Sequence, residues 1–338
     1  MTLAIRRLAR GAVLASAVAG FCNLSACTSA DRATDKTPVS QAASASVPDL
    51  SGLAWIEGDR FLAVHDAKGH HDQPRVGLLE LPKSMGEGLR HRPVEIVWPA
   101  TGPAGDLEAI AGIPGTSLYL LVESGSASRA GTPLQRIFLA DYRDRQLRVT
   151  ETVDWPVPVE NVEGVAVARS GDQQVFLFAE RAEGRGATAL RWAPLALQPL
   201  GFGSFQEVVV TIPDPAGAHA RPVSAIEIDS QGTIFIASAI DPGKDDGPFR
   251  SVIWRIGRIA MNAAGVAHVL ISDPPQRLAT LDGLKVEAVA IREVSGRPAE
   301  IFFGTDDENF GGIVRRIPGG AGPLALEMGE GASHTARQ

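Results

Sequence analysis

The sequence predicts an all-β protein, a five-bladed β-propeller with four strands in each blade, over residues 49–328. The first observation is a short pattern that occurs five times: an acid or serine, a small residue, an aliphatic residue and a fourth residue that is alanine in four of the five copies. Its first positions, 55 to 63 residues apart, are Ser51, Glu108, Glu163, Ser224 and Glu287. The second observation is that each unit contains four short apolar runs, with no long helical period competing. Units of this kind are typical of repeat architectures.

The pattern opens the first strand of each unit, and three further runs follow it. The predicted second strands are Phe61–Val64, Leu118–Val122, Val175–Ala179, Ile234–Ala237 and Ile301–Gly304. The predicted third strands are Val76–Leu81, Gln135–Ala140, Thr188–Trp192, Ser251–Ile256 and Gly312–Ile317. The predicted fourth strands are Val94–Trp98, Leu147–Val153, Glu207–Ile212, His268–Ser272 and, weakly, Leu324–Met328. Because proline lacks a ladder donor, Pro99, Pro156, Pro213 and Pro274 should end the first four of these. A β-sandwich or a solenoid with coincidental spacing is the alternative.

The N-terminus predicts export. Three arginines precede residues 11–26, an uncharged stretch that is shorter than the roughly 20 residues a membrane span needs. We therefore expect residues 1–26 to be a removable signal peptide. Leu24-Ser25-Ala26-Cys27 resembles the lipobox of bacterial lipoproteins, which implies that Cys27 carries the lipid anchor and localises the protein to the cell envelope.

The segments outside the repeats are polar. Residues 27–48 hold the anchor and a run poor in bulky side chains, which we expect to be a flexible tether, and residues 329–338 should be a disordered tail. Thr28, in place of an aspartate, favours the outer membrane by resemblance to Gram-negative sorting. Both cysteines lie within the first 27 residues, so the folded part has no disulfide and no thiolate metal site.

The charge argues against nucleic acid as a partner. The formal net charge is −7, and removing the signal, which has three arginines and no acid, leaves −10. A chain this acidic, with no basic run, is unsuited to nucleic acid or anionic lipid. We expect a monomer whose ligand is a small anionic or phosphorylated molecule.

Propeller topology should gather acids at one mouth of the central channel. Inner strands start on the face to which second strands return, so both sets of strand ends share it. The inner strands start with Glu108, Glu163 and Glu287. The second strands end with Asp66, Glu123, Glu180 and Asp306.

Like charges around a mouth raise one another's pKa, so either several of these acids are protonated or a cation sits among them. Hard oxygen donors suit Ca²⁺. We expect Glu108, Glu163, Glu287 and Asp306 to be metal ligands and Asp66, Glu123 and Glu180 to be catalytic. A purely structural ring, in which the acids accept backbone hydrogen bonds, is the alternative.

Basic groups share this face. His70, beside His71, is a candidate proton shuttle, and Lys68, Arg75 and Arg181 are candidate substrate-binding residues. The same cations could instead neutralise the acids.

The repeat motifs resemble those of exported proteins described as having phytase-type esterase activity. The likeness spans most of residues 49–320 and rests on Asp49-Leu-Ser-Gly-Leu-Ala54, Asp106-Leu-Glu-Ala-Ile-Ala111, Asn161-Val-Glu-Gly-Val-Ala166 and Lys285-Val-Glu-Ala-Val-Ala290. The resemblance implies a Ca²⁺-dependent phosphoester hydrolase. Five repeats in place of six, and the lack of a dense Lys and Arg run, depart from true propeller phytases.

Three function hypotheses remain open: a cation-dependent hydrolase of phosphoesters, a non-catalytic envelope protein that binds a ligand or partner, and a lactonase-like propeller. Three carboxylates converging at metal-ligand distance would favour an enzyme. A mouth plugged by salt bridges would favour binding.

The anchor can be tested directly. Changing Cys27→Ser removes the sulfur that would be acylated, so the protein should leave the membrane fraction or remain unprocessed. Fractionation and the mass of the mature N-terminus measure this. A variant that fractionates like the parent would contradict the lipid anchor.

Overall fold

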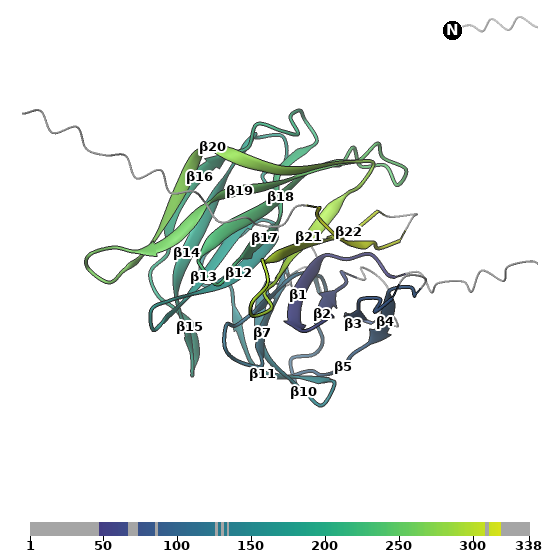
Figure 1. The fold of residues 1–338 in the computed structure, drawn as a ribbon. Coiled ribbons are helices and arrows are strands. Elements are labelled where there is room, and N and C mark those ends of the chain that lie inside the picture. Colours follow the sequence, from purple (N-terminus) through teal and green to yellow (C-terminus); the bar gives the residue numbers. More distant parts are fainter. Residues whose placement is uncertain are drawn as a thin grey trace, which may run out of the picture. The chain divides into compact units, whose positions relative to one another are not determined.

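The computed structural model describes residues 47–66, 74–84, 87–125, 128–129, 132–133, 135–307 and 311–318. Within these residues every element is a strand, and the strands form five blades around a central axis (Figure 1). This confirms the predicted fold class. The predicted signal peptide, Cys27, the tether up to residue 46, the fourth run of blade five and the C-terminal tail lie outside the described residues. The described part of the chain contains no helix long and apolar enough to cross a membrane.

The blades follow one another along the chain. Blade one consists of β1 (Gly52–Glu57), β2 (Arg60–Val64), β3 (Val76–Glu80) and β4 (Arg90–Pro93). Blade two consists of β6 (Leu107–Gly112), β7 (Leu118–Glu123), β10 (Arg136–Arg143) and β11 (Gln146–Asp154), with a hairpin of β8 (Ser128–Arg129) and β9 (Thr132–Pro133) between its second and third strands. Blade three consists of β12 (Val162–Ser170), β13 (Gln173–Glu180), β14 (Ala187–Leu197), β15 (Leu200–Phe202) and β16 (Gln206–Thr211). Blade four consists of β17 (Ala220–Ile228), β18 (Thr233–Ile240), β19 (Arg250–Met261) and β20 (Ala267–Asp282). Blade five has β21 (Val286–Arg292), β22 (Glu300–Thr305) and β23 (Val314–Arg316).

The ring closes between blades five and one. Each inner strand contacts the inner strands of both neighbouring blades, including β1 with β21. The segment that precedes β1 also bonds to blade five. The N–H of Leu50 donates to the carbonyl of Thr305 at 3.0 Å, and the N–H of Gly312 donates to the carbonyl of Val47 at 2.8 Å. The chain entering the propeller is thus fastened to the chain leaving it.

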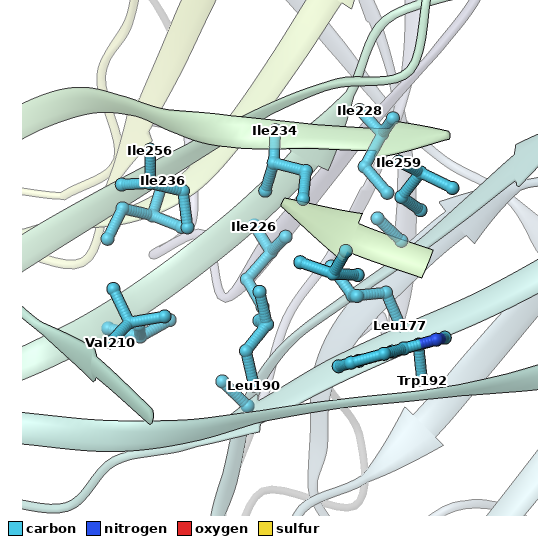
Figure 2. Packing of buried hydrophobic residues seen from close by; sticks show 14 of the residues in the cluster. Leu177, Leu190, Trp192, Val210, Ile226, Ile228, Ile234, Ile236, Ile256 and Ile259 are labelled. Carbon is cyan, nitrogen blue, oxygen red and sulfur yellow. The ribbon is translucent and has the colours of Figure 1, made fainter. Parts of the chain in front are cut away.

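The core of the described residues lies between blades. Five apolar clusters each join one pair of neighbouring blades. Figure 2 shows the cluster between blades three and four, where Leu177 and Trp192 of blade three face Ile226 and Ile234 of blade four. Alternate residues of one strand face opposite clusters. Because both faces of a blade are buried, its second strand is a continuous apolar run rather than an alternating one.

Two details of the predicted strands are wrong. The run Val94–Trp98 is not the fourth strand of blade one, because the polar residues of β4 occupy that edge. Its centre, β5 (Glu95–Val97), instead pairs in parallel with β11 of blade two. Pro274 does not end a strand but lies inside β20. The register there passes from Gly257 opposite Ile271 to Arg255 opposite Gln276, so Pro274 occupies a bulge where no ladder donor is needed.

The small second residue of the recurring pattern has a packing reason. At Gly164, a Cβ atom would lie 2.7 Å from the backbone nitrogen of Ile226 in the next inner strand. At Gly52 it would lie 3.0 Å from the backbone nitrogen of Ile110. At these two places the inner strands therefore approach too closely for a Cβ atom without strain, whereas the other three copies of the pattern have alanine there.

This constraint predicts the effect of one methyl group. Gly164→Ala should lower the free energy of unfolding by about 1–3 kcal/mol, the usual cost of forced overpacking. Gly112→Ala is the matched control, because a Cβ there would lie 3.5 Å from Tyr119 in ordinary contact. Urea denaturation of both variants measures the difference. Equal stabilities would refute the close-approach account.

Candidate functional site

The starts of the inner strands and the ends of the second strands lie together at one end of the channel. Glu108, Glu163 and Glu287, from blades two, three and five, are each at most 5% exposed there. We call the end lined by these three residues the acidic mouth. Its surroundings differ between the side of blades three to five and the side of blades one and two.

Arg221, in β17, joins three blades on the first side. Its Nη1 lies 2.6 Å from Oε1 of Glu287 and 3.9 Å from Oε2 of Glu163. Its Nη2 lies 2.6 Å from Oδ2 of Asp241. Burial alone would lower the pKa of Arg221, but Glu287 and Glu163 outweigh it and raise that pKa. The guanidinium of Arg221 thus stays charged and neutralises acids at the acidic mouth.

Lys285 forms a second centre of ion pairs. Its Nζ lies 2.7 Å from Oδ2 of Asp306 and 3.4 Å from both Oδ2 of Asp241 and Oε1 of Glu287. Burial and the neighbouring Glu287 raise the pKa of Asp306 to about 9, although Lys285 opposes them. Burial also acts to raise the pKa of Glu287, but Lys285 and Arg221 prevail and lower it. Burial and the mutual repulsion of the two acids thus favour a proton shared between Asp306 and Glu287.

Arg181 reaches into the acidic mouth from the loop after β13. Its Nε lies 2.5 Å from Oε1 of Glu163. Burial would lower the pKa of Arg181, but Glu163, Glu287 and Glu108 raise it. Burial raises the pKa of Glu163, while Arg181 and Arg221 act to lower it. A predicted metal ligand and a predicted substrate-binding residue are thus bonded to each other.

Two predicted catalytic acids are bonded within their own blades. The fully buried Glu123 receives two bonds from Arg136, at 2.8 and 2.7 Å, and the N–H of Gly105 donates to it at 2.7 Å. Glu180 repeats the arrangement one blade later: Arg191 pairs with it at 3.0 Å, and the N–H of Glu160 donates to it at 2.5 Å. In both blades the acid at the end of the second strand holds the segment that enters the inner strand.

The side of blades one and two brings three carboxylates together. Asp66 follows β2, while Asp106 and Glu108 lie at the start of β6. One oxygen from each lies within 4.8 Å of the other two, close enough for a single metal ion. Asp106 is fully buried, and its Oδ2 accepts a bond of 2.6 Å from Oγ of Ser124. We call Asp66, Asp106 and Glu108 the carboxylate triad.

Arg75 lies beside the triad. Its guanidinium donates to the carbonyls of Asp66 and Gly105, the second at 3.3 Å. Burial lowers the pKa of Arg75, and Asp66, Asp106 and Glu123 oppose that shift. The structure thus places one predicted substrate-binding residue at the edge of a group of acids.

His65 shapes the end of β2 next to the triad. Its Nδ1 lies 2.7 Å from the carbonyl oxygen of Asp49, and its Nε2 lies 3.3 Å from Nε2 of His91. Burial lowers the pKa of His65 to about 4, and the proximity of His91 adds to the effect. His65 is therefore neutral at physiological pH and fixes the strand end that carries Asp66.

Some residues of the site were not predicted from the sequence, and two predicted residues lie outside the described part of the chain. Lys68 and His70 lie outside the described residues, so their roles stay predictions. Sequence reasoning did not select Asp106 as a ligand. The sequence did contain a signal for Asp106. Alternate residues of a strand point to the same face, and Asp106 lies two residues before Glu108. Arg136, Arg191 and Arg221 carried no such signal, because their partners come from other strands.

The shared proton predicts a pH effect. The pKa of Asp306 rises from 3.8 to about 9 on folding, so between these values the folded chain holds a proton that the unfolded chain has lost. Stability should therefore fall as pH rises through this window, by at most about 1.4 kcal/mol per pH unit. Asp306→Asn should flatten this slope and stabilise the chain at pH 8. Urea denaturation from pH 5 to 9 measures it, with the exposed Asp172→Asn as control. Parallel curves for wild type and Asp306→Asn would contradict the protonated pair.

No protein-family model matches the chain, and no curated protein matches it either. Solved structures do match its fold. An endo-arabinase from Bacteroides thetaiotaomicron aligns with a TM-score of 0.50 at 9% identity, covering 81% of this chain and 95% of that chain. An exo-1,5-α-L-arabinanase from a bovine ruminal metagenomic library aligns with a TM-score of 0.45 at 12% identity, covering 81% and 94%.

A third match, an endo-1,4-β-xylanase from Bacteroides thetaiotaomicron, has a TM-score of 0.45 at 10% identity and covers 77% of this chain and 85% of that chain. At such identities the likeness of the first match concerns the fold alone. It supports a propeller fold and does not support the resemblance to phytase-type proteins. The chain is a five-bladed propeller similar in fold to that endo-arabinase.

Proposed function

We propose that the protein is a cation-dependent hydrolase, acting on phosphoesters, whose metal ion binds at the carboxylate triad. The observation that supports this most directly is the convergence of Asp66, Asp106 and Glu108 from two blades within 4.8 Å. Elsewhere at the acidic mouth, Glu163, Glu287 and Asp306 each lie against a side-chain cation of the protein itself. The proposed metal set keeps Glu108 and adds Asp66 and Asp106, because the oxygens of these three residues converge.

The triad's donor chemistry fits Ca²⁺. Ca²⁺ takes about six to eight oxygen ligands and accepts irregular geometry, whereas Mg²⁺ demands a near-ideal octahedron. Three carboxylates supply up to six oxygens, and water would complete the shell. The triad contains only hard oxygen donors, without the nitrogen or sulfur that zinc prefers.

The residues around the triad suit an anionic substrate. When bound, Ca²⁺ would polarise a phosphoryl oxygen and lower the pKa of an attacking water. Arg75 would hold a second phosphate oxygen, since a guanidinium suits phosphate geometry. The bond from Ser124 keeps the carboxylate of Asp106 in place. Lys68 and His70, a few residues beyond Asp66 in the chain, remain proposed contributors to the same site.

A second candidate function is non-catalytic binding. The observation that favours it is the ion-pair network of Arg221, Lys285, Asp241, Glu287 and Asp306, which occupies the acidic mouth on the side of blades three to five. A mouth filled in this way leaves less room for a substrate and presents a fixed polar surface to a ligand or a partner protein. In either case we propose that the chain is held at the cell envelope through Cys27.

Calcium binding is the first test. Calcium at 100 times its dissociation constant should add about 2.7 kcal/mol to the stability of the wild-type chain. Asp106→Asn should lose most of this gain, because it removes a charge from the centre of the triad. Thermal melts with calcium and with EGTA measure it. Asp141→Asn is a matched control: Asp141 also accepts a serine hydroxyl at 2.6 Å but lies on an outer strand.

Activity separates the two candidate functions. The wild-type chain should hydrolyse 4-nitrophenyl phosphate in the presence of calcium, and Asp106→Asn should not. A 4-nitrophenyl arabinoside, a carboxylester and a lactone serve as comparison substrates. Calcium binding without turnover of any of them would leave the binding function as the better account. Identical melts with calcium and EGTA would remove the metal site altogether.

A further inference from the structure

The opposite end of the channel holds a cavity of about 520 Å³. All five blades line it, through the far ends of the inner strands and the turns after them, with Trp55, Ile113, Val167, Glu227 and Ile291 each from a different blade. The volume lies within the range typical of small-molecule sites. The function proposed for the acidic mouth makes no use of this cavity.

The walls of the cavity combine polar groups with apolar side chains. Ile56, Ile113, Val167, Ile228 and Ile291 line it from all five blades. An aromatic surface adjoins them: the indole N–H of Trp55 donates to the carbonyl of Gly58 at 3.1 Å, which ties the ring to its own hairpin. Such walls suit a ligand with an apolar or aromatic body.

The charged groups that line the cavity are mostly acids. Glu227, Asp229 and Glu293 face a single cation, Arg169. Arg169 is directed to its own turn, where its Nε donates to the carbonyl of Gly171 at 3.1 Å. Asp229 and Glu293 accept only neutral donors in the described structure, from the turn at Ser230 to Thr233. The cavity therefore carries net negative charge.

Glu227 lies on the inner strand of blade four, next to Ile228 of the cavity wall. Its Oε1 accepts the N–H of Ile228 at 2.8 Å. Among the described residues, no cationic side chain lies within ion-pair distance of it. Burial raises the pKa of Glu227 to about 8, and Glu293 and Asp229 add to the rise. A carboxyl with a raised pKa is largely protonated at neutral pH, and a nearby cation favours its ionised form.

We propose that this cavity binds a small organic amine with an apolar body, the ammonium group lying against Glu227 and the body against the isoleucine wall and Trp55. An anion would be repelled by the carboxylates that line the cavity. A bare metal ion would lack a converging set of ligands, because among the described residues only the carboxylate triad brings three such oxygens within 4.8 Å of one another. An ammonium on an apolar body satisfies both the charge and the walls, and an adjacent indole face adds cation–π attraction.

The test uses three probes with one body and three charges: tryptamine, tryptophol and indole-3-acetate. Binding to the purified full chain is measured by calorimetry and located by NMR. Tryptamine should bind at least about tenfold more tightly than tryptophol, since a hydrogen bond to a charged group is worth more than a neutral one. Indole-3-acetate should bind least. Tryptamine binding at pH 7 should release a proton, seen as different heats in phosphate and Tris, and should tighten as pH rises from 6 to 8.

Glu227→Gln keeps the size of the side chain and removes its charge. It should reduce tryptamine affinity to that of tryptophol and abolish the proton release, whereas Glu207→Gln, on an exposed outer strand, should change neither. If Glu227→Gln fails to fold, the three-probe comparison on the wild-type chain still decides. Equal affinity for tryptamine and tryptophol, or binding located away from the Glu227 cavity, would overturn the proposal. These outcomes are independent of calcium binding at the carboxylate triad.

Discussion

The close approach of five inner strands around one axis is the constraint on which the rest of the structure depends. At Gly164 and Gly52 the neighbouring backbone is so near that even a methyl group could not be added without strain. The blades then splay outward, and the wedges between them are filled by the five inter-blade clusters. Since every blade is buried on both faces, the apolar content of the chain is concentrated in short continuous runs. The narrow axis also forces polar residues at the strand starts into one another's reach.

That crowding sets the chemistry at the acidic mouth. Carboxylates that cannot spread apart must be neutralised, and the chain does so in different ways on its two sides. Arg181, Arg221 and Lys285 supply positive charge next to blades three to five, and burial together with Glu287 raises the pKa of Asp306. Beside blades one and two, three carboxylates converge next to Arg75. The two sides thus differ: cations of the protein pair with the acids on one side, and three carboxylates converge on the other, where we propose that a metal ion binds.

The sequence could predict the blades because their signals are local. A strand start, an apolar run and a turn each occupy a few residues, and the repeat multiplies them. The site could be predicted only in outline, because its interactions join residues distant in sequence. Glu108 and Glu163 hold the same place in the pattern, yet Glu163 pairs with Arg181 while Glu108 lies with Asp66 of another blade. Nothing in the pattern distinguishes them. For the same reason the polar strand β4 was missed, since it pairs at an edge without an apolar alternation.

The bonds that join residues 47–50 to blade five have a mechanical consequence. The chain enters the propeller at the seam between its first and last blades, where Val47 and Leu50 bond to Gly312 and Thr305. Any force applied through the N-terminal segment is therefore carried first by these few hydrogen bonds, before it reaches the inner strands. A force on the N-terminal segment acts on the contact between blades five and one, the one contact between neighbouring blades that is not also bridged by the chain running from one blade into the next. We therefore expect this seam to break first under tension. Its rupture would open the ring while leaving the individual blades intact.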